Sequence, residues 1–210
     1  MAKTAWNEEI EGLIRDTRTL ANRRLKNEGL HDLLFGVGGW LKLNEAGFLH
    51  NQASKVKEGV IVEIGSYRGR SAIAMAKDSI VPVYAIDPHN MMVDGMGGSF
   101  TSKDRAVFIE NIFKAGVHEK VHIVNLESNH AAMGWSKPIG LLWIDGDHSF
   151  KQVKLDAVNW IPHVIKGGLI AFHDCRYEDV AKALKWIEEN DDWSLEPVGA
   201  CGSIKAYRKA

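Results

Sequence analysis

The stretch that decides the fold covers residues 60–71 and reads Val60-Ile61-Val62-Glu63-Ile64-Gly65-Ser66-Tyr67-Arg68-Gly69-Arg70-Ser71. Its first five residues are mostly β-branched and apolar, which predicts a buried strand. A glycine turn follows this strand, and a helix is predicted from Ser71 onward. The order of strand, glycine turn and helix is typical of the first unit of a nucleotide-binding α/β domain.

Short β-rich runs alternate with helical patterns along the rest of the chain. Further strands are predicted over residues 82–86, 121–124, 140–144 and 168–172, and two more over 194–197 and 203–208. Helices are predicted over residues 71–77, 103–115, 150–161 and 178–190. This alternation predicts an α/β fold with a mostly parallel seven-stranded sheet and helices on both faces.

The region before the first strand has a different pattern. Helical periodicity is present over residues 5–30, and another helix is predicted from about Asn44 to Val56. We therefore expect residues 1–59 to form a helical cover or interface segment and residues 60–210 to form the ligand-binding domain. The first helix carries a basic cluster, which is either a solvated face or a docking surface: Arg15, Arg18, Arg23, Arg24 and Lys26.

Composition limits the classes of function. The 210 residues are 45% hydrophobic and 25% charged, and 26 Lys and Arg balance 27 Asp and Glu. A net charge of -1 argues against a dedicated nucleic-acid binder and favours a small-molecule partner. No apolar run reaches the roughly 18 residues of a membrane helix. Two cysteines without metal-type spacing indicate reduced thiols, so we expect a cytoplasmic protein without a membrane partner.

The glycine turn also limits the class of ligand that could bind there. Tyr67 occupies the position where a dinucleotide fingerprint has its second glycine, which lets the backbone approach a pyrophosphate. A side chain there argues against NAD and favours a nucleoside without pyrophosphate, such as S-adenosylmethionine (AdoMet). Asp87 closes the second strand roughly 20 residues later, where an acidic residue usually binds ribose hydroxyls. The alternative interpretation is that these are ordinary turn residues.

Three segments carry a resemblance to a known family. They are the segment from about Leu41 to Arg70 together with Ala85-Ile86-Asp87, the block Ile144-Asp145-Gly146-Asp147-His148-Ser149-Phe150, and the block Lys166-Gly167-Gly168-Leu169-Ile170-Ala171-Phe172-His173-Asp174. With them the chain resembles Rossmann-like class I AdoMet-dependent methyltransferases. It is most similar to the small family related to macrolide-sugar and rhamnosyl O-methyltransferases and to cephalosporin biosynthetic methyltransferase-like proteins.

The resemblance implies a cofactor site for AdoMet. Its methionine end would lie against the glycine turn and its ribose against Asp87, and the turn after the third strand would contact the adenine. The implied cofactor residues are Glu63, Gly65, Ser66, Tyr67, Gly69, Ser71, Asp87, Glu127, Ser128 and Asp145.

Acidic and histidine side chains follow two neighbouring strands. Because the carboxyl ends of parallel strands meet at one edge of a sheet, Asp145, His173 and Asp174 are expected to converge there. They could hold Mg²⁺, and a histidine would shift the preference toward another divalent metal. The resemblance places Asp145 and His148 in catalysis, with His148 as the general base. The alternative is structural, with Asp147 capping the helix that begins near Phe150.

These observations leave three functions open. The first is AdoMet-dependent O-methylation of a small hydroxylated molecule, such as a sugar or a secondary metabolite, with or without help from a divalent metal. The second is a metal-dependent hydrolase that uses the Asp/His cluster. The third is a non-catalytic AdoMet-binding module. The segment Pro88–Phe100 is expected to be a lid or a surface loop, and the N-terminal region could support a homo-oligomer.

Overall fold

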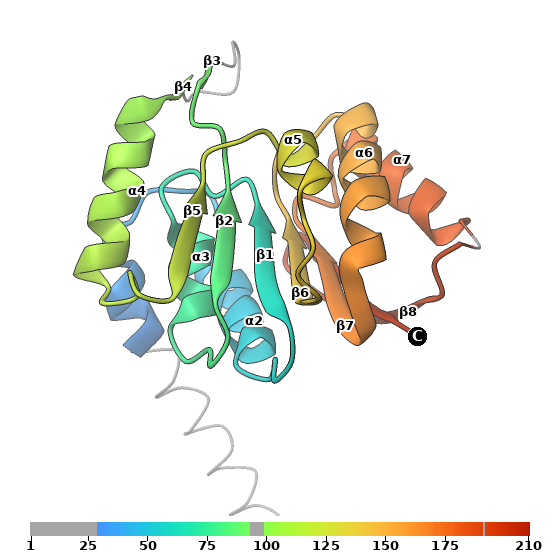
Figure 1. Ribbon diagram of the computed structural model, residues 1–210, viewed down its shortest axis with the longest axis horizontal. Helices are drawn as coiled ribbons and strands as arrows, with labels where there is room; N and C mark the ends of the chain where they lie inside the picture. The colour runs from blue at the N-terminus through green and yellow to red at the C-terminus, as the bar shows by residue number, and fades with distance from the viewer. Residues whose placement is uncertain (1–28, 93–98, 191) are drawn as a thin grey trace, which may run out of the picture.

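The structure, a computed structural model, describes residues 29–92, 99–190 and 192–210. A seven-stranded sheet in the order β5-β2-β1-β6-β7-β9-β8 crosses the molecule (Figure 1). The first five strands in this order are parallel to one another, and β9 runs antiparallel to both of its neighbours. The strands are β1 (Val60–Ile64), β2 (Val83–Ile86), β5 (Val121–Val124), β6 (Ile139–Ile144), β7 (Val164–Phe172), β8 (Leu195–Cys201) and β9 (Ile204–Lys209).

Helices cover both faces of this sheet, as the alternating pattern predicts (Figure 1). One face carries α2 (Leu43–Ala53), α3 (Arg70–Ala76) and α4 (Ser102–Lys114). The other carries α5 (Ser128–Met133), α6 (Phe150–Trp160) and α7 (Glu178–Glu188), with a short 3₁₀ turn over Ile161–His163. A class I methyltransferase-like architecture of this kind confirms the predicted fold class.

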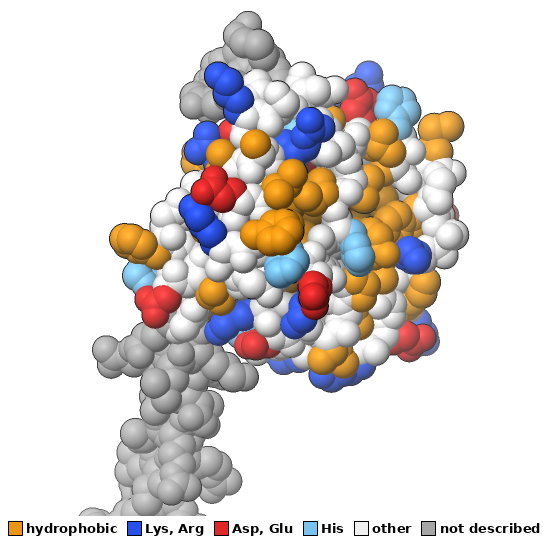
Figure 2. Space-filling view, turned by 60° about the vertical axis from the view of Figure 1, so that its left-hand side comes forward, with side chains coloured by type: hydrophobic (Ala, Val, Ile, Leu, Met, Phe, Trp, Pro, Cys, Tyr) orange, Lys and Arg blue, Asp and Glu red, His pale blue; other side chains and the backbone are white. Residues whose placement is uncertain are grey.

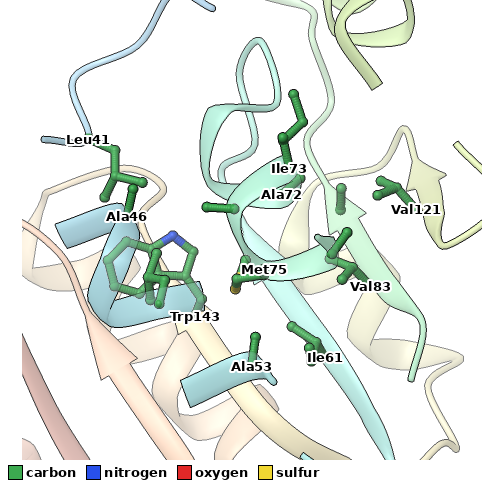
Figure 3. Close-up of a cluster of buried hydrophobic side chains, with 14 of the residues drawn as sticks. Leu41, Ala46, Ala53, Ile61, Ala72, Ile73, Met75, Val83, Val121 and Trp143 are labelled. Atoms are coloured by element: carbon green, nitrogen blue, oxygen red, sulfur yellow. The ribbon is translucent and has the colours of Figure 1, made fainter. Parts of the chain in front are cut away.

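The core on the α2 side is centred on the sheet. Trp143 of β6 is fully buried and lies among small side chains from α2, including Ala46, with Met75 of α3 nearby (Figure 3). Alanines at these positions let the helices approach the sheet closely, which leaves room for the indole ring. Burying one large apolar side chain stabilises the fold by roughly 1.5–3 kcal/mol. The face covered by α6 and α7 has its own core around Trp160 and Phe172.

Most element boundaries agree closely with the predicted ones, and four differences are clear. Strand β8 extends to Cys201 rather than ending at residue 197. Strand β7 begins at Val164 rather than at residue 168, because its pairing with β6 shifts register near Gly167, whose φ is +77°. Helix α5 was not predicted, since six residues are too few for a clear helical period. Within Pro88–Phe100 the structure forms a two-stranded ribbon of β3 (Met91–Met92) and β4 (Ser99–Phe100).

The predicted N-terminal cover is described only in part. Residues 1–28, which hold the predicted basic cluster and most of the helix expected over 5–30, lie outside the described residues, as do 93–98 of the expected lid. Helix α2 packs on α3 and buries Leu49 in the core of the sheet. No helix among the described residues is long and apolar enough to cross a membrane.

The surface on the α4 side mixes chemical types. Turned to bring this side forward, the molecule shows hydrophobic side chains distributed among basic and acidic ones (Figure 2). Two of the exposed apolar side chains come from α4: Phe113 is 58% exposed and Ile109 is 39% exposed. Scattered exposed apolar residues of this kind are normal for a protein surface.

Candidate functional site

The strand order reverses at β1, between β2 and β6. After β1 the chain moves outward through β2 to β5, and it then returns to β6 on the other side of β1. Ligands of open α/β sheets bind where the strand order reverses in this way. The predicted site residues lie at or after the ends of β1, β2, β5, β6 and β7, so the topology brings these five strand ends to one edge of the sheet.

The turn after β1 requires glycine at its first position. Gly65 has a φ of +85°, and a Cβ atom there would collide with the backbone carbonyl oxygen of Asp145. The backbone of Asp145 in turn donates to the Ile64 carbonyl at 2.8 Å. Only a residue without a side chain permits this approach, which fixes the end of β1 against the end of β6.

Glu63 places a carboxyl group beneath this turn. The residue is fully buried, and neither carboxyl oxygen has a hydrogen-bond partner of good geometry within the described part of the chain. Burial, supported by the charges of Asp145 and Asp87, raises the pKa of Glu63 to about 8, although the nearby Ser71 hydroxyl opposes the rise. A buried carboxyl without a partner is costly, and a cationic ligand group would supply one.

Asp87, at the end of β2, organises the backbone around the glycine turn. Its Oδ2 accepts the N–H groups of Ser66 (3.1 Å) and Tyr67 (2.8 Å), and its Oδ1 accepts that of His89 (2.9 Å). Tyr67 and His89 adopt φ values of +45° and +47°, in the left-handed region that side chains disfavour, and these bonds offset the strain. The Oδ1 atom has a second acceptor position, which a ribose hydroxyl could occupy.

His89 completes this loop and was not predicted as a site residue. Its Nε2 lies 2.6 Å from the Tyr67 carbonyl, which only accepts, so Nε2 carries the proton. Its Nδ1 then accepts from the Asn125 side-chain amide at 3.1 Å. This arrangement fixes the orientation of the ring, and it ties the ends of β2 and β5 to the glycine turn.

The two residues predicted to contact the adenine point in different directions. Ser128 is buried, donates a short hydrogen bond to Asp156 of α6 and accepts one from Gln152. Glu127 is exposed and lies 3.4 Å from the ring of His130 in its own helix. Burial raises the pKa of Asp156 to about 6, although the hydrogen bonds from Ser128 and Gln152 oppose the rise. Ser128 therefore belongs to an ordered polar network, whereas Glu127 lies at the surface.

Three side chains converge at the ends of β6 and β7. Asp145, His148 and Asp174 each offer one ligand atom, and these three atoms lie within 4.8 Å of one another. All three side chains are half-buried. The His148 Nε2 atom is buried and lies 3.5 Å from Asp174 Oδ2 and 3.7 Å from Asp145 Oδ1, without good hydrogen-bond geometry. Asp174 has a φ of +50°, a backbone conformation that turns its carboxylate toward this cluster. The arrangement is suited to a cation or to proton transfer.

The ring of His148 has a defined orientation. It stacks on Tyr177 with 5.4 Å between ring centroids and 20° between planes. The interaction with Asp145 raises the pKa of His148 although burial opposes the rise, and Asp174 adds to it. Asp147, by contrast, accepts the Ser149 N–H at 2.7 Å next to the start of α6, where Ser149 itself is the N-cap.

His173 lies beside this cluster, with both ring nitrogens already paired. Its Nδ1 lies 3.0 Å from Asp145 Oδ1, and its Nε2 lies 3.3 Å from Oε2 of Glu45 on α2. Burial opposes a charge on this ring, but the carboxylates of Asp145, Asp174 and Glu45 outweigh it and raise the pKa of His173 to about 9. The role of His173 as a metal ligand stays a prediction, and the geometry shows a histidine that donates to two carboxylates.

The geometry thus brings most of the predicted residues together and adds two, His89 and Glu45. Glu45 was not predicted, because it comes from the segment before β1 and no local motif marks it. An acidic residue three positions after the N-cap is the signal that could have indicated a helix start, and the structure shows that capping box. Nothing in the sequence indicates that the same carboxylate reaches β7.

Comparisons with known proteins identify the family and the fold. A family model described as a methyltransferase domain matches residues 62–175. Among solved structures, the O-methyltransferase NovP aligns with a TM-score of 0.67 at 14% identity, covering 82% of this chain and 83% of that chain. An O-methyltransferase from Bacillus cereus in complex with SAH aligns with a TM-score of 0.64 at 16% identity, covering 87% of this chain and 91% of that chain. At these identities the likeness to solved structures shows the fold.

Proposed function

Because this chain belongs to the methyltransferase-domain family, we propose that it transfers the methyl group of AdoMet to a hydroxyl oxygen of a small acceptor. The observation that carries the proposal is the convergence of an unpartnered buried carboxyl, Glu63, and the cluster of Asp145, His148 and Asp174 at the switch point of the sheet. A similar fold in proteins named O-methyltransferases supports oxygen as the acceptor atom.

The residues around the glycine turn fit AdoMet. Glu63 offers its carboxyl to the ammonium group, and Asp87 keeps an acceptor position for a ribose hydroxyl. Ser128 begins α5 just after β5, at the same edge of the sheet, where the base would lie. When bound, AdoMet supplies an electrophilic methyl group. The chain then contributes binding and orientation, which can account for a large part of the rate of such a displacement.

The cluster at β6 and β7 fits a divalent cation. Asp145 and Asp174 offer hard oxygen ligands, and the His148 Nε2 atom completes a set that suits Mn²⁺ or a related metal as well as Mg²⁺. When bound there, a cation lowers the pKa of a chelated hydroxyl. The unpartnered Nε2 favours His148 over His173 as the third ligand, since both nitrogens of His173 are occupied.

The same atoms also allow a mechanism without a cation. His148 Nε2 would then accept the proton of the acceptor hydroxyl, and the nearby Asp145 and Asp174 carboxylates would stabilise the resulting imidazolium. His148→Gln separates the two roles. As a ligand, His148 controls the affinity for Mn²⁺ as well as turnover. As a base, it controls turnover alone.

The expected partners follow from the composition and the surface. The near-neutral charge supports a small hydroxylated acceptor, such as a sugar or secondary metabolite, rather than nucleic acid. The free thiols of Cys175 and Cys201 support a reducing compartment such as the cytoplasm. Exposed Phe35 and Trp40 near α2 are candidates for a homo-oligomer contact, which sedimentation of Trp40→Ala would test.

Calorimetry and a turnover assay test the function directly. We expect the protein to bind AdoMet and to methylate at least one member of a library of sugars and phenols. A metal-dependent hydrolase would bind neither AdoMet nor S-adenosylhomocysteine, and a non-catalytic module would bind AdoMet without turnover.

A matched pair of variants tests the site. Asp145→Asn should lower turnover by about 10²-fold or more, because it removes a ligand or orienting charge from the reacting centre. Asp147→Asn, at an exposed position two residues away, should leave turnover within a few-fold of wild type. Equal activity of the two variants would show that the cluster does not take part in the reaction.

A further inference from the structure

Glu45 is a buried carboxylate that belongs to the segment before β1 but reaches the proposed active site. It lies near the start of α2 and has no exposed surface. Its side chain contacts three separate parts of the chain: the backbone before α2, the turn between β8 and β9, and His173 at the end of β7.

Four donors converge on this carboxylate. Oε1 accepts from the backbone N–H of Ser203 at 2.7 Å and from its hydroxyl at 2.9 Å. Oε2 accepts from the Lys42 N–H at 2.9 Å and lies 3.3 Å from His173 Nε2. Burial opposes the charge, yet the hydrogen bonds from Ser203 and Lys42 lower the pKa of Glu45 to about 2. The four donors match a carboxylate, which accepts at every position.

The turn between β8 and β9 is shaped around the same carboxylate. Gly202 has a φ of +64°, and a Cβ atom there would collide with Oε1 of Glu45. Glu45 thus holds the last hairpin of the sheet and His173 in one arrangement. Because each oxygen serves a different partner, the contact with the hairpin and the contact with His173 can be tested separately.

His173 links Glu45 to Asp145 through its two ring nitrogens. Its ring packs against buried Trp143, with 5.4 Å between ring centroids, so rotation about the side-chain bonds is restricted. With Nε2 directed to Glu45, the opposite nitrogen Nδ1 faces Asp145 Oδ1 at 3.0 Å. A bond of this kind to a ligating carboxylate fixes the orientation of that carboxylate.

We propose that Glu45 is a positioning residue, which acts through His173 to orient Asp145 for the cation or the acceptor. The role of Asp145 in holding a cation or the acceptor rests on the proposed function. The placement of the His173 ring by Glu45 does not rest on it. Partners of metal ligands typically change metal affinity or activity by 10–100-fold when removed, and we expect Glu45 to fall in this range.

The experiment compares Glu45→Ala, Glu45→Gln and Ser203→Ala in the full chain. Mn²⁺ alone is the probe of affinity by calorimetry, crystal structures give the distance from His173 Nδ1 to Asp145 Oδ1, and chemical denaturation gives stability. Glu45→Ala should raise the Kd for Mn²⁺ about 10–100-fold and break the contact between His173 and Asp145. Ser203→Ala should lower stability while both the Kd and the contact stay as in wild type.

Glu45→Gln distinguishes positioning from a merely structural role. Its amide nitrogen can face the Ser203 hydroxyl, while its carbonyl oxygen still accepts from His173. This variant should therefore recover most of the Mn²⁺ affinity but still lose stability, because the Ser203 N–H loses its acceptor. If Glu45→Ala does not fold, Glu45→Asp replaces it, since a shorter acid can cap α2 but does not reach His173.

Two results would overturn the proposal. One is a Glu45→Ala protein that keeps both the contact between His173 and Asp145 and the affinity for Mn²⁺. The other is a Ser203→Ala protein that loses as much affinity as Glu45→Ala. If wild type binds AdoMet but no Mn²⁺, the cation part of the proposed function fails, and the contact in the crystal structures then decides the positioning role.

Discussion

At the scale of single residues, hydrogen-bond donors decide how buried acids of this site behave. Glu63, Glu45 and Asp156 are all buried acids, yet the pKa is raised to about 8 in the first, lowered to about 2 in the second and raised to about 6 in the third. The difference lies in their hydrogen-bond donors. Glu45 has four, whereas neither oxygen of Glu63 has one of good geometry.

Glu63 makes AdoMet binding sensitive to protons. With a pKa of about 8 its carboxyl is mostly protonated at pH 7, and a neighbouring ammonium group would lower that pKa. Binding of AdoMet at pH 7 should therefore release up to about one proton from the protein. The measurement is the calorimetric enthalpy in buffers of different ionisation enthalpy. Glu63→Gln should release about one proton fewer than wild type, and equal release from both proteins would contradict this role.

At the scale of elements, the short helix α5 depends on its neighbour α6. Ser128 at the start of α5 donates to Asp156, which also accepts from Gln152 of its own helix at 3.0 Å. The second oxygen of Asp156 is buried without a partner. This polar link replaces the apolar face that a six-residue helix is too short to provide.

The link predicts a pH-dependent stability. The pKa of Asp156 is raised on folding from 3.8 to about 6, so its stabilising contribution is complete below pH 3.8 and is lost as the pH rises through 6. Asp156→Asn lacks this titration. Relative to wild type, the variant should gain on the order of 2–3 kcal/mol of unfolding free energy between pH 4 and pH 7. Urea denaturation across this range checks it. Asp147→Asn is the exposed control, and a pH-independent difference would contradict the prediction.

At the scale of the whole molecule, the described residues before β1 are part of the fold. Leu30, Leu34, Leu41 and Leu49 are buried in the same core as Trp143. At roughly 1.5–3 kcal/mol each, these four leucines contribute about 6–12 kcal/mol. A typical domain has a net stability of about 5–15 kcal/mol. The described residues before β1 therefore share one core with the sheet, and the division of the chain at residue 60 stays a prediction.

Residues 60–210 expressed alone should accordingly fail to unfold cooperatively. Removing the preceding segment exposes one face of β1 and β6 and takes away the partner of His173 and Ser203. Thermal unfolding followed by circular dichroism gives the measurement. The full chain with Leu49→Ala is the control, which should lose about 2–5 kcal/mol but keep a cooperative transition. A cooperative transition of residues 60–210 near the full-chain midpoint would contradict this expectation.

Much of this protein could be read from local patterns. The turn at Gly65, the period of the strands and the acidic ends of β2 and β6 each depend on residues close in sequence, so the fold class, the family and the edge of the sheet that carries the site were all predictable. The short helix α5 and the shift in β7 were not, because six residues give no clear period and a register shift depends on the paired strand.

The sequence by itself determined the α/β fold and the candidate side chains at the strand ends, because periodicity and glycine turns act over a few residues. Only the tertiary structure decided which histidine has a free ring nitrogen. His148 and His173 look alike in sequence, but Glu45, 128 positions away from His173, occupies one nitrogen of that ring. Hydrogen bonds between side chains so distant depend on how the helices pack on the sheet, and no local pattern records that packing.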